Sequence, residues 1–205
     1  MSNTSDSRAI GWVRRFLPFC LLTLLPFLAS CSEADDTVEE YANWEQKNEE
    51  AFLNIYNQAL ASGDGQWKVI RAYTKADTYN GAIDPYDYIV VEVRETGAGT
   101  VSPCQTDSVS IHYKGWLLPS YSYSKGYSFD GSYDGEYNKA TSHPVSDVTP
   151  GGFIKGFATA LQHMHVGDYW RVYIPYTLAY GESGTSGIPG YSMLIFDLRL
   201  QDIWN

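Results

Sequence analysis

The C-terminal part of the chain alternates apolar and mostly polar side chains, and this pattern constrains the fold more than any other feature of the sequence. A two-residue period is typical of a β-strand with one buried face. The apolar positions of the run are Leu194, Phe196, Leu198 and Leu200. Three earlier segments rich in β-branched and aromatic residues also predict strands, at 88–93, 108–116 and 169–174. The sequence therefore predicts a β-rich domain.

One short helical pattern lies among these strands. Its apolar residues stand three or four positions apart, at Ile154, Phe157, Leu161 and Met164. A single helix laid across an antiparallel sheet makes an α+β domain, whose core forms between the helix and the inner face of the sheet. We therefore predict the α+β fold class.

An additional helix is predicted N-terminal to this domain. Thr37-Val38-Glu39-Glu40 has the pattern of a capping box, and apolar residues at helical spacing continue to about Ala61. A Ser-Gly-Asp-Gly stretch then ends the pattern. Because one amphipathic helix cannot bury its own apolar face, we expect it to dock on the following domain, with a dimer arm as the alternative.

The start of the chain has the layout of a secretory signal. Arg14 and Arg15 precede an apolar run over 16–29, which is short for a membrane-spanning helix and contains two prolines. The run ends in Leu-Ala-Ser followed by Cys31, which resembles the lipobox of bacterial lipoproteins. An ordinary signal peptide with a chance cysteine is the alternative.

A lipidated Cys31 would anchor the mature chain to a membrane of the cell envelope. The acidic stretch 32–36 resembles signals that send lipoproteins to the outer face of the outer membrane, and a solvated tether is its alternative role. We therefore expect an outer-membrane location, on the periplasmic face or the cell surface. The expected organisation is a signal peptide over 1–30, an acidic tether with a helical segment over 31–84, and a folded domain over 85–205.

Charge and composition exclude several classes of function. The formal charge of −10 argues against a nucleic-acid-binding surface. His163 and His165 are the closest pair among four histidines, and no cysteine or paired acid completes a metal site. The Gly-rich loop 181–187 lacks the lysine of a phosphate loop. We therefore expect no metal, no cofactor and no nucleic-acid partner, and assign Cys104 no chemistry.

Several short motifs lie where the strands and the helix would converge. They are His-Tyr-Lys-Gly at 112–115, Phe-Asp-Gly-Ser at 129–132, Phe-Ile-Lys-Gly-Phe at 153–157, Pro-Tyr-Thr-Leu-Ala-Tyr-Gly at 175–181, Gly-Ile-Pro at 187–189 and Leu-Ile-Phe-Asp-Leu at 194–198. In this order, over roughly residues 85 to 204, they resemble the FKBP-type peptidyl-prolyl cis-trans isomerases, the macrolide-binding prolyl isomerase family. The resemblance implies a twisted antiparallel sheet wrapped around one short helix, with a pocket between them that binds proline-containing peptide.

The resemblance also implies roles for individual residues. Those implied as catalytic are Tyr113, Phe129, Asp130, Ile154, Phe157, Tyr180 and Phe196; those implied in substrate binding are Phe153, Ile188 and Val145. Asp130 would reach toward the substrate backbone, the Ile154 N–H would donate to a substrate carbonyl, and Phe157 would form the pocket floor. Plain core packing is the alternative role of Tyr113, Phe157 and Phe196.

The sequence departs from the family at three places. The floor position is typically Trp and is Phe157 here, and the aromatic residue usual before the helix is replaced near Val145. Both changes weaken the expected binding of macrolide inhibitors more than catalysis. The segment 119–142 is also longer than in minimal members.

Three functions are weighed on these residues. The first is isomerisation of X-Pro bonds in exported proteins, as a folding helper. The second is a catalytically weak peptide-binding or chaperone module of the same fold. The third is a surface glycan-binding lipoprotein that stacks sugars on the tyrosines at 121, 123, 127, 133 and 137.

Overall fold

The computed structural model describes residues 39–75 and 84–204. The predicted signal peptide, the lipobox with Cys31, the acidic stretch and Thr37 lie outside the described residues. The described residues belong to one compact unit. Within the described ranges, no helix is long and apolar enough to cross a membrane.

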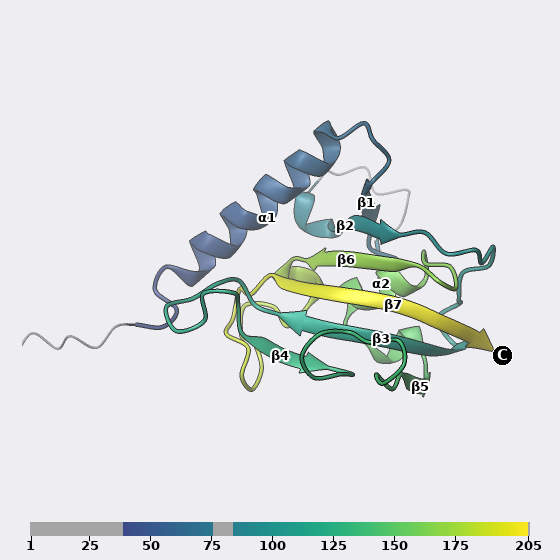
Figure 1. Ribbon diagram of the computed structural model, residues 1–205. Helices are drawn as coiled ribbons and strands as arrows, with labels where there is room; N and C mark the ends of the chain where they lie inside the picture. The colour runs from purple at the N-terminus through teal and green to yellow at the C-terminus, as the bar shows by residue number, and fades with distance from the viewer. Residues whose placement is uncertain (1–38, 76–83, 205) are drawn as a thin grey trace, which may run out of the picture. The chain divides into compact units, whose positions relative to one another are not determined.

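The described chain forms two α-helices and seven strands in one sheet (Figure 1). In chain order they are α1 (Trp44–Ala61), β1 (Trp67–Arg71), β2 (Tyr88–Glu95), β3 (Ser108–Trp116), β4 (Ser128–Gly131), β5 (Val145–Val148), α2 (Lys155–Leu161), β6 (Tyr169–Ile174) and β7 (Leu194–Trp204). Short 3-10 turns lie at Pro85–Asp87, Pro150–Gly152 and Tyr176–Leu178.

All strand pairs are antiparallel, in the order β1-β2-β6-β7-β3-β4, and β5 also pairs with β3. The predicted α+β class is confirmed, and β3 and β6 have the predicted bounds. The sheet begins before residue 85, because β1 pairs along β2. The long segment 119–142 contains β4, which pairs with β3.

The predicted start of the N-terminal helix is wrong. The helix α1 begins at Trp44, after a turn at residues 40–43. Asn43 precedes it in the left-handed conformation, with φ 52°, which interrupts any helix that approaches from the N-terminal side. The spacing of Tyr41 therefore suggests a helical turn that the backbone does not make.

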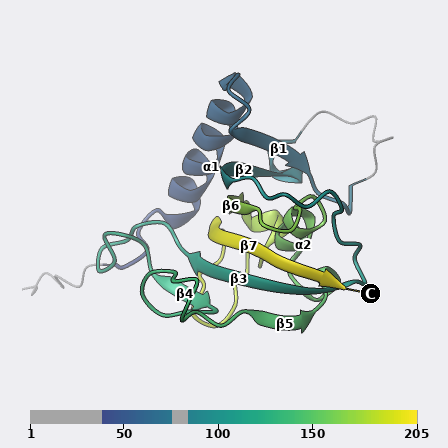
Figure 2. The ribbon, with the colours of Figure 1, turned by 45° about the vertical axis from the view of Figure 1, so that its right-hand side comes forward.

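One face of the sheet packs against α2. Trp170, Val172 and Ile174 alternate along β6 as fully buried residues, and they meet Phe157 and Leu161 of the helix in the main hydrophobic core. The helix lies close to the sheet because its second residue is a glycine, where a Cβ would collide with Ile174. Figure 2 shows α2 behind the central strands.

The other face of the sheet packs against α1. Ile89 and Val91 of β2 belong to the core on the α2 side, whereas Val90 contacts a second cluster with Phe52 and Tyr56 of α1. Successive residues of a strand point to opposite faces, so the two helices cover opposite faces of the sheet. The predicted docking of the N-terminal helix on the domain is thus what the structure shows.

A buried polar contact fixes α1 to the segment that leads into β7. The Trp44 indole N–H donates to Ser192 Oγ at 2.8 Å, and Asn48 Oδ1 accepts from the Met193 N–H at 2.9 Å. The Asn48 amide nitrogen donates to the Trp44 carbonyl at 2.7 Å. Because Asn48 is 1% exposed, its loss would leave a buried N–H without an acceptor.

We therefore expect Asn48→Ala to lower the free energy of unfolding by about 1–3 kcal/mol, measured by urea denaturation. The matched control is Asn54→Ala, because Asn54 is an exposed residue of the same helix. The control should change stability by less than about 0.5 kcal/mol. Equal effects of the two substitutions would show that α1 is not fixed in this way.

Candidate functional site

A hydrogen bond between neighbouring strands organises one side of the candidate site. The Tyr113 hydroxyl on β3 donates to Asp130 Oδ2 on β4 at 3.0 Å. The other carboxylate oxygen of Asp130 accepts from the Gly131 N–H at 2.8 Å. Both oxygens of Asp130 are therefore held, and the tyrosine ring has a fixed position.

A β-bulge and a glycine bring two further rings to this side. The register of β3 with β4 is irregular between Gly115 and Trp116, opposite Phe129. A Cβ on Gly115 would lie 2.6 Å from the Phe129 ring and 2.7 Å from the Phe196 ring. Only a glycine at 115 allows both rings to approach the sheet, where their centroids are 5.5 Å apart at an interplanar angle of 89°.

The start of α2 supplies the opposite side of the site. Phe157, which is 2% exposed, makes edge contacts with Phe196 at 5.0 Å and with Tyr113 at 5.7 Å between ring centroids. Phe153 lies 4.6 Å from Phe157 at the end of a 3-10 turn. Ile154 is the N-cap of α2, and its N–H has no acceptor among the described residues.

These side chains enclose one cavity of about 270 Å³. The lining residues are Tyr113, Phe129, Asp130, Gly152, Phe153, Ile154, Phe157, Tyr180 and Phe196. The structure thus brings together all seven residues implied as catalytic, and Phe153 with them. It does not place Ile188 or Val145 in this lining: Ile188 is buried in the main core, and Val145 lies on β5 opposite Ile111.

The cavity is apolar, with a few hydrogen-bonding groups at its edge. Burial, together with the hydrogen bond to Asp130 and the negative charge of that carboxylate, raises the pKa of Tyr113 to about 12. The phenol therefore stays protonated and remains a donor at neutral pH. Tyr180 is 40% exposed at the rim. Such a pocket suits a small apolar ring whose flanking polar groups remain near the opening.

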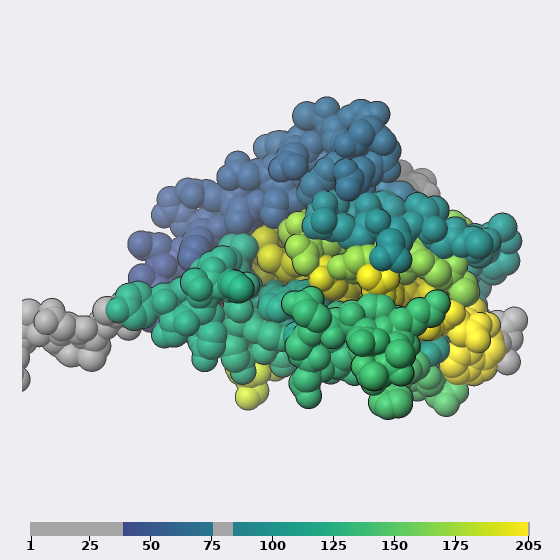
Figure 3. All heavy atoms as spheres, viewed as in Figure 1, coloured from purple at the N-terminus to yellow at the C-terminus, as the bar shows by residue number. Residues whose placement is uncertain are grey.

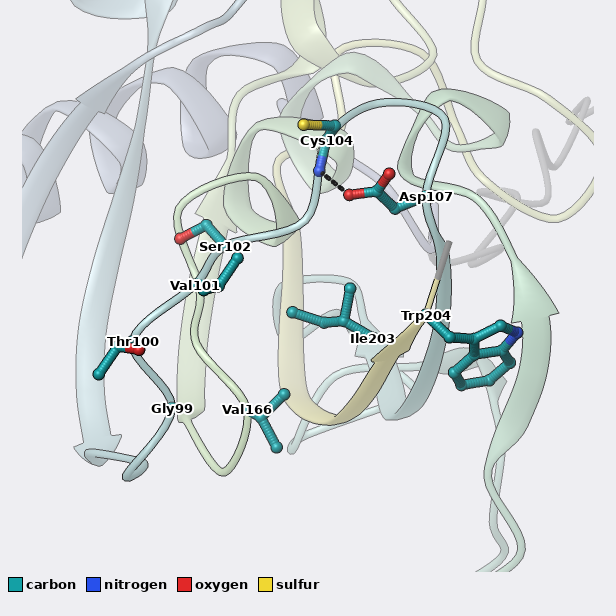
Figure 4. Close-up of a pocket in the computed structure, with 9 residues that line it drawn as sticks. All are labelled: Gly99, Thr100, Val101, Ser102, Cys104, Asp107, Val166, Ile203 and Trp204. Carbon is teal, nitrogen blue, oxygen red and sulfur yellow. Dashed lines mark hydrogen bonds between the residues drawn. The ribbon is translucent and has the colours of Figure 1, made fainter.

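A larger cavity of about 500 Å³ lies at the carboxyl end of β7 (Figure 4). Its walls include Val101, Val166 and Ile203. Cys104 and Asp107 also line it, but the Asp107 carboxylate accepts from the backbone N–H of Cys104 at 2.6 Å and not from its thiol. Asp107 is the one carboxylate or histidine among the described residues that line this cavity, and its hydrogen bond is to the backbone and not to the thiol. The cavity therefore shows no nucleophile–base pair, and the aromatic cavity is the better candidate despite its smaller volume.

The remaining polar motifs have structural surroundings. His163 Nδ1 lies 2.8 Å from the Thr159 carbonyl one turn earlier, and His165 Nδ1 lies 3.8 Å from the Asp168 carboxylate. In the part of the chain that the structure describes, no group of three or more His, Cys, Asp or Glu side chains could hold a metal ion.

Two glycines of the site were not predicted as part of it. Gly152 lines the cavity directly, and Gly115 leaves the space that Phe129 and Phe196 occupy. Gly115 stands inside one of the motifs, but a glycine within a strand pattern shows only that something approaches the backbone closely. Which rings approach depends on the pairing of β3 with β4 and β7.

Comparison with known proteins agrees with this geometry. Residues 99–201 match the family model described as FKBP-type peptidyl-prolyl cis-trans isomerase. The chain is 42% identical over 188 residues to the macrophage infectivity potentiator of Trypanosoma cruzi, an alignment that covers 91% of this chain and 82% of that protein.

Relatives named FkpA match over a shorter span. The chain is 35% identical over 115 residues to FkpA of Escherichia coli, which covers 56% of this chain and 37% of that protein. The crystal structure of FkpA from Escherichia coli aligns with a TM-score of 0.55 at 27% identity, over 80% of this chain and 62% of that chain. The chain thus spans less than two thirds of the length of FkpA.

The half-buried Tyr113 phenol predicts that the stability of the chain is sensitive to alkaline pH. An unfolded tyrosine ionises near pH 10, whereas folded Tyr113 holds its proton to about pH 12. Between these values the folded state binds more protons, so the stabilisation that is present below pH 10 is lost as pH rises toward 12. Tyr86 and Tyr133, whose pKa values burial also raises to about 12, act in the same direction.

We therefore expect the free energy of unfolding to fall above about pH 10, and to fall less steeply in Tyr113→Phe. Denaturation curves of both proteins at increasing pH test this. Tyr121→Phe is the control, because Tyr121 is 72% exposed and contributes no buried hydroxyl. A slope in Tyr113→Phe equal to that of the unmodified chain would contradict the assignment.

Proposed function

Because this chain belongs to the FKBP-type peptidyl-prolyl cis-trans isomerase family, we propose that its aromatic cavity binds the proline ring of X-Pro segments in exported proteins and accelerates their cis-trans exchange. The observation that carries the proposal is the single cavity of about 270 Å³ lined by Tyr113, Phe129, Phe157 and Phe196. These rings come from β3, β4, α2 and β7, and they leave a hollow suited to a pyrrolidine ring.

The chemistry requires no nucleophile. Rotation about an X-Pro bond has a barrier near 20 kcal/mol, because the amide loses its resonance at the twisted transition state. The twisted amide has less charge separation than the planar one, so an apolar, water-poor cavity stabilises it relative to the ground state. Phe157 and Phe196, at 2% and 4% exposure, supply that environment.

The polar groups at the rim hold the substrate in the proposed mechanism. The Ile154 N–H, which has no acceptor among the described residues, donates to a substrate carbonyl. Asp130, fixed by Tyr113, faces the substrate backbone, and the Tyr180 hydroxyl is a second donor. Positioned donors of this kind restrict the peptide to the conformation that rotates.

The floor of the cavity affects inhibitors more than catalysis. Phe157 has no indole N–H and a smaller ring than the tryptophan usual at this position in the family. We propose that macrolide inhibitors bind, but less tightly than to members with tryptophan there. Catalysis depends on the apolar surroundings of the proline ring, which a phenylalanine floor keeps.

The isomerase proposal predicts that the chain accelerates exchange of a Phe-Pro or Leu-Pro peptide, measured by a protease-coupled or NMR exchange assay. Phe129→Ala should lower kcat/KM by about tenfold or more, equivalent to about 1.4 kcal/mol or more of transition-state stabilisation, because the ring that packs on proline is lost. Tyr121→Ala is the control in the same segment. Exchange at the background rate with micromolar protein would contradict the activity.

We further propose that the chain is attached to the cell envelope through a lipid on Cys31, after removal of residues 1–30. The support is the signal-like run followed by the lipobox-like Leu-Ala-Ser-Cys sequence. In this proposal the acidic stretch and the segment to residue 84 connect the anchor to the folded domain of 85–205, to which α1 and β1 also attach.

The lipid anchor predicts that Cys31→Ser abolishes incorporation of labelled palmitate and moves the protein from the membrane fraction to the soluble fraction. Cys104→Ser is the matched control, because Cys104 is the exposed cysteine of the described residues. Palmitate labelling that persists in Cys31→Ser would contradict lipidation at this residue.

A further inference from the structure

A polar and aromatic cavity lies on the face of the sheet opposite the candidate active site. The Tyr113 and Phe196 side chains face the aromatic cavity, so their neighbours Lys114 and Asp197 point to the other face. There they border a cavity of about 300 Å³, here called the outer pocket. Arg171 of β6 also lines it. The outer pocket lies on the sheet face that α1 covers at β1 and β2.

The floor of the outer pocket is an ion pair on two central strands. Arg171 donates to both oxygens of Asp197, at 2.7 and 2.9 Å. Asp197 is 9% exposed, and its hydrogen bonds are the main cause that raises the pKa of Arg171. Paired groups of this geometry offer planar donors and acceptors whose charges are already neutralised.

The opposite wall comes from the segment between β4 and β5 and is fixed to the sheet. The guanidinium carbon of Arg199 lies 3.6 Å from the ring centroid of Tyr169 on β6 and 4.5 Å from that of Tyr137. The Lys114 ammonium donates to the Gly135 carbonyl at 2.9 Å. These contacts hold the wall in place before a ligand binds, which lowers the entropic cost of binding.

The charges of the outer pocket argue against an anionic ligand. Arg171 is paired with Asp197, and Arg199 is paired with both oxygens of Glu95 at 3.1 Å. Glu136 also lines the pocket and offsets the charge of Lys114. The three cations therefore lie among three carboxylates and leave no excess positive charge for an anion, whereas a neutral ligand with hydroxyl groups can add to the existing contacts.

Aromatic rings supply the other half of the recognition surface. Trp116, Tyr133, Tyr137 and Tyr169 all line the outer pocket. Aromatic side chains combine a large apolar surface with a polar tip, and sugar rings combine apolar C–H faces with equatorial hydroxyls. From this match we infer that the outer pocket binds a neutral carbohydrate. Its volume is at the low end for ligand sites, which favours one sugar ring over a long chain.

The tyrosines of the 119–142 segment divide into two groups in the structure. Tyr133 and Tyr137 line the outer pocket and pack on the buried His112 ring at 6.4 and 5.0 Å between centroids. Tyr123 and Tyr127 instead contact each other at 4.9 Å and are not part of this lining. Carbohydrate binding therefore depends on two of the five tyrosines considered from the sequence.

The test is a titration of the full chain with the methyl glycosides of glucose, galactose, mannose and N-acetylglucosamine, followed by NMR of the tryptophan indole N–H signals. We expect at least one sugar to give saturable binding, with a Kd of about 1 mM or below. The Trp116 signal should move, and that of Trp67 should not, because Trp67 stacks on Tyr173 beside α1.

Variants separate binding from folding. Tyr137→Ala should weaken the sugar affinity about tenfold, whereas Tyr121→Ala should leave it unchanged, and thermal unfolding verifies that both variants fold. Because the signal of Trp116 reports on the unmodified chain, the inference is tested even if Tyr137→Ala does not fold. It is overturned if none of the four sugars saturates, if the shifts arise at the aromatic cavity, or if inorganic phosphate binds at Trp116 more tightly than every sugar.

Discussion

The position and register of β7 support every functional feature of this domain. The strand pairs with β6 on one side and β3 on the other, so its side chains occupy the middle of both faces of the sheet. Phe196 therefore points into the aromatic cavity and Asp197 into the outer pocket. A shift of one residue would exchange the two faces and place a carboxylate among phenylalanines, and the desolvation cost of that arrangement makes the register unambiguous.

Two glycines shape the aromatic cavity as much as its rings do. Gly115 leaves room for Phe129 and Phe196, and Gly156 lets α2 approach β6 closely enough for Phe157 to reach the same rings. The resulting contacts are mostly edge-to-face, the arrangement that the charge distribution of aromatic rings favours. The cavity is therefore set by backbone spacing, and its walls do not depend on a bound peptide.

The sequence predicted the strands whose side-chain pattern follows directly from which of their faces are buried. The alternation in β7 and the runs that became β3 and β6 depend on burial of one or both faces, which the sequence displays directly. The motifs also identified every lining residue of the aromatic cavity except Gly152, because the resemblance to a known family implies which segments come together. The same resemblance wrongly implied Ile188 and Val145 as lining residues. The start of α1 was missed because the sequence shows a capping pattern earlier in the chain. Asn43, which sets the actual start, adopts a left-handed conformation that its residue type permits but does not predict.

Contacts between distant segments explain the rest of what the sequence did not reveal. Asn48 looks like an ordinary polar helix residue, yet its buried bond to Met193 joins positions that only the folded sheet brings together. The same holds for the 119–142 segment, which reads as one polar insertion. One part of it forms β4 and carries Phe129 and Asp130, and a later part is fixed to the sheet through Arg199 and Lys114. Because each part has its own contacts with the sheet, the segment supplies a wall to each of the two cavities. A ligand in one cavity can influence the other only by the difference in its affinity for two positions of that shared segment.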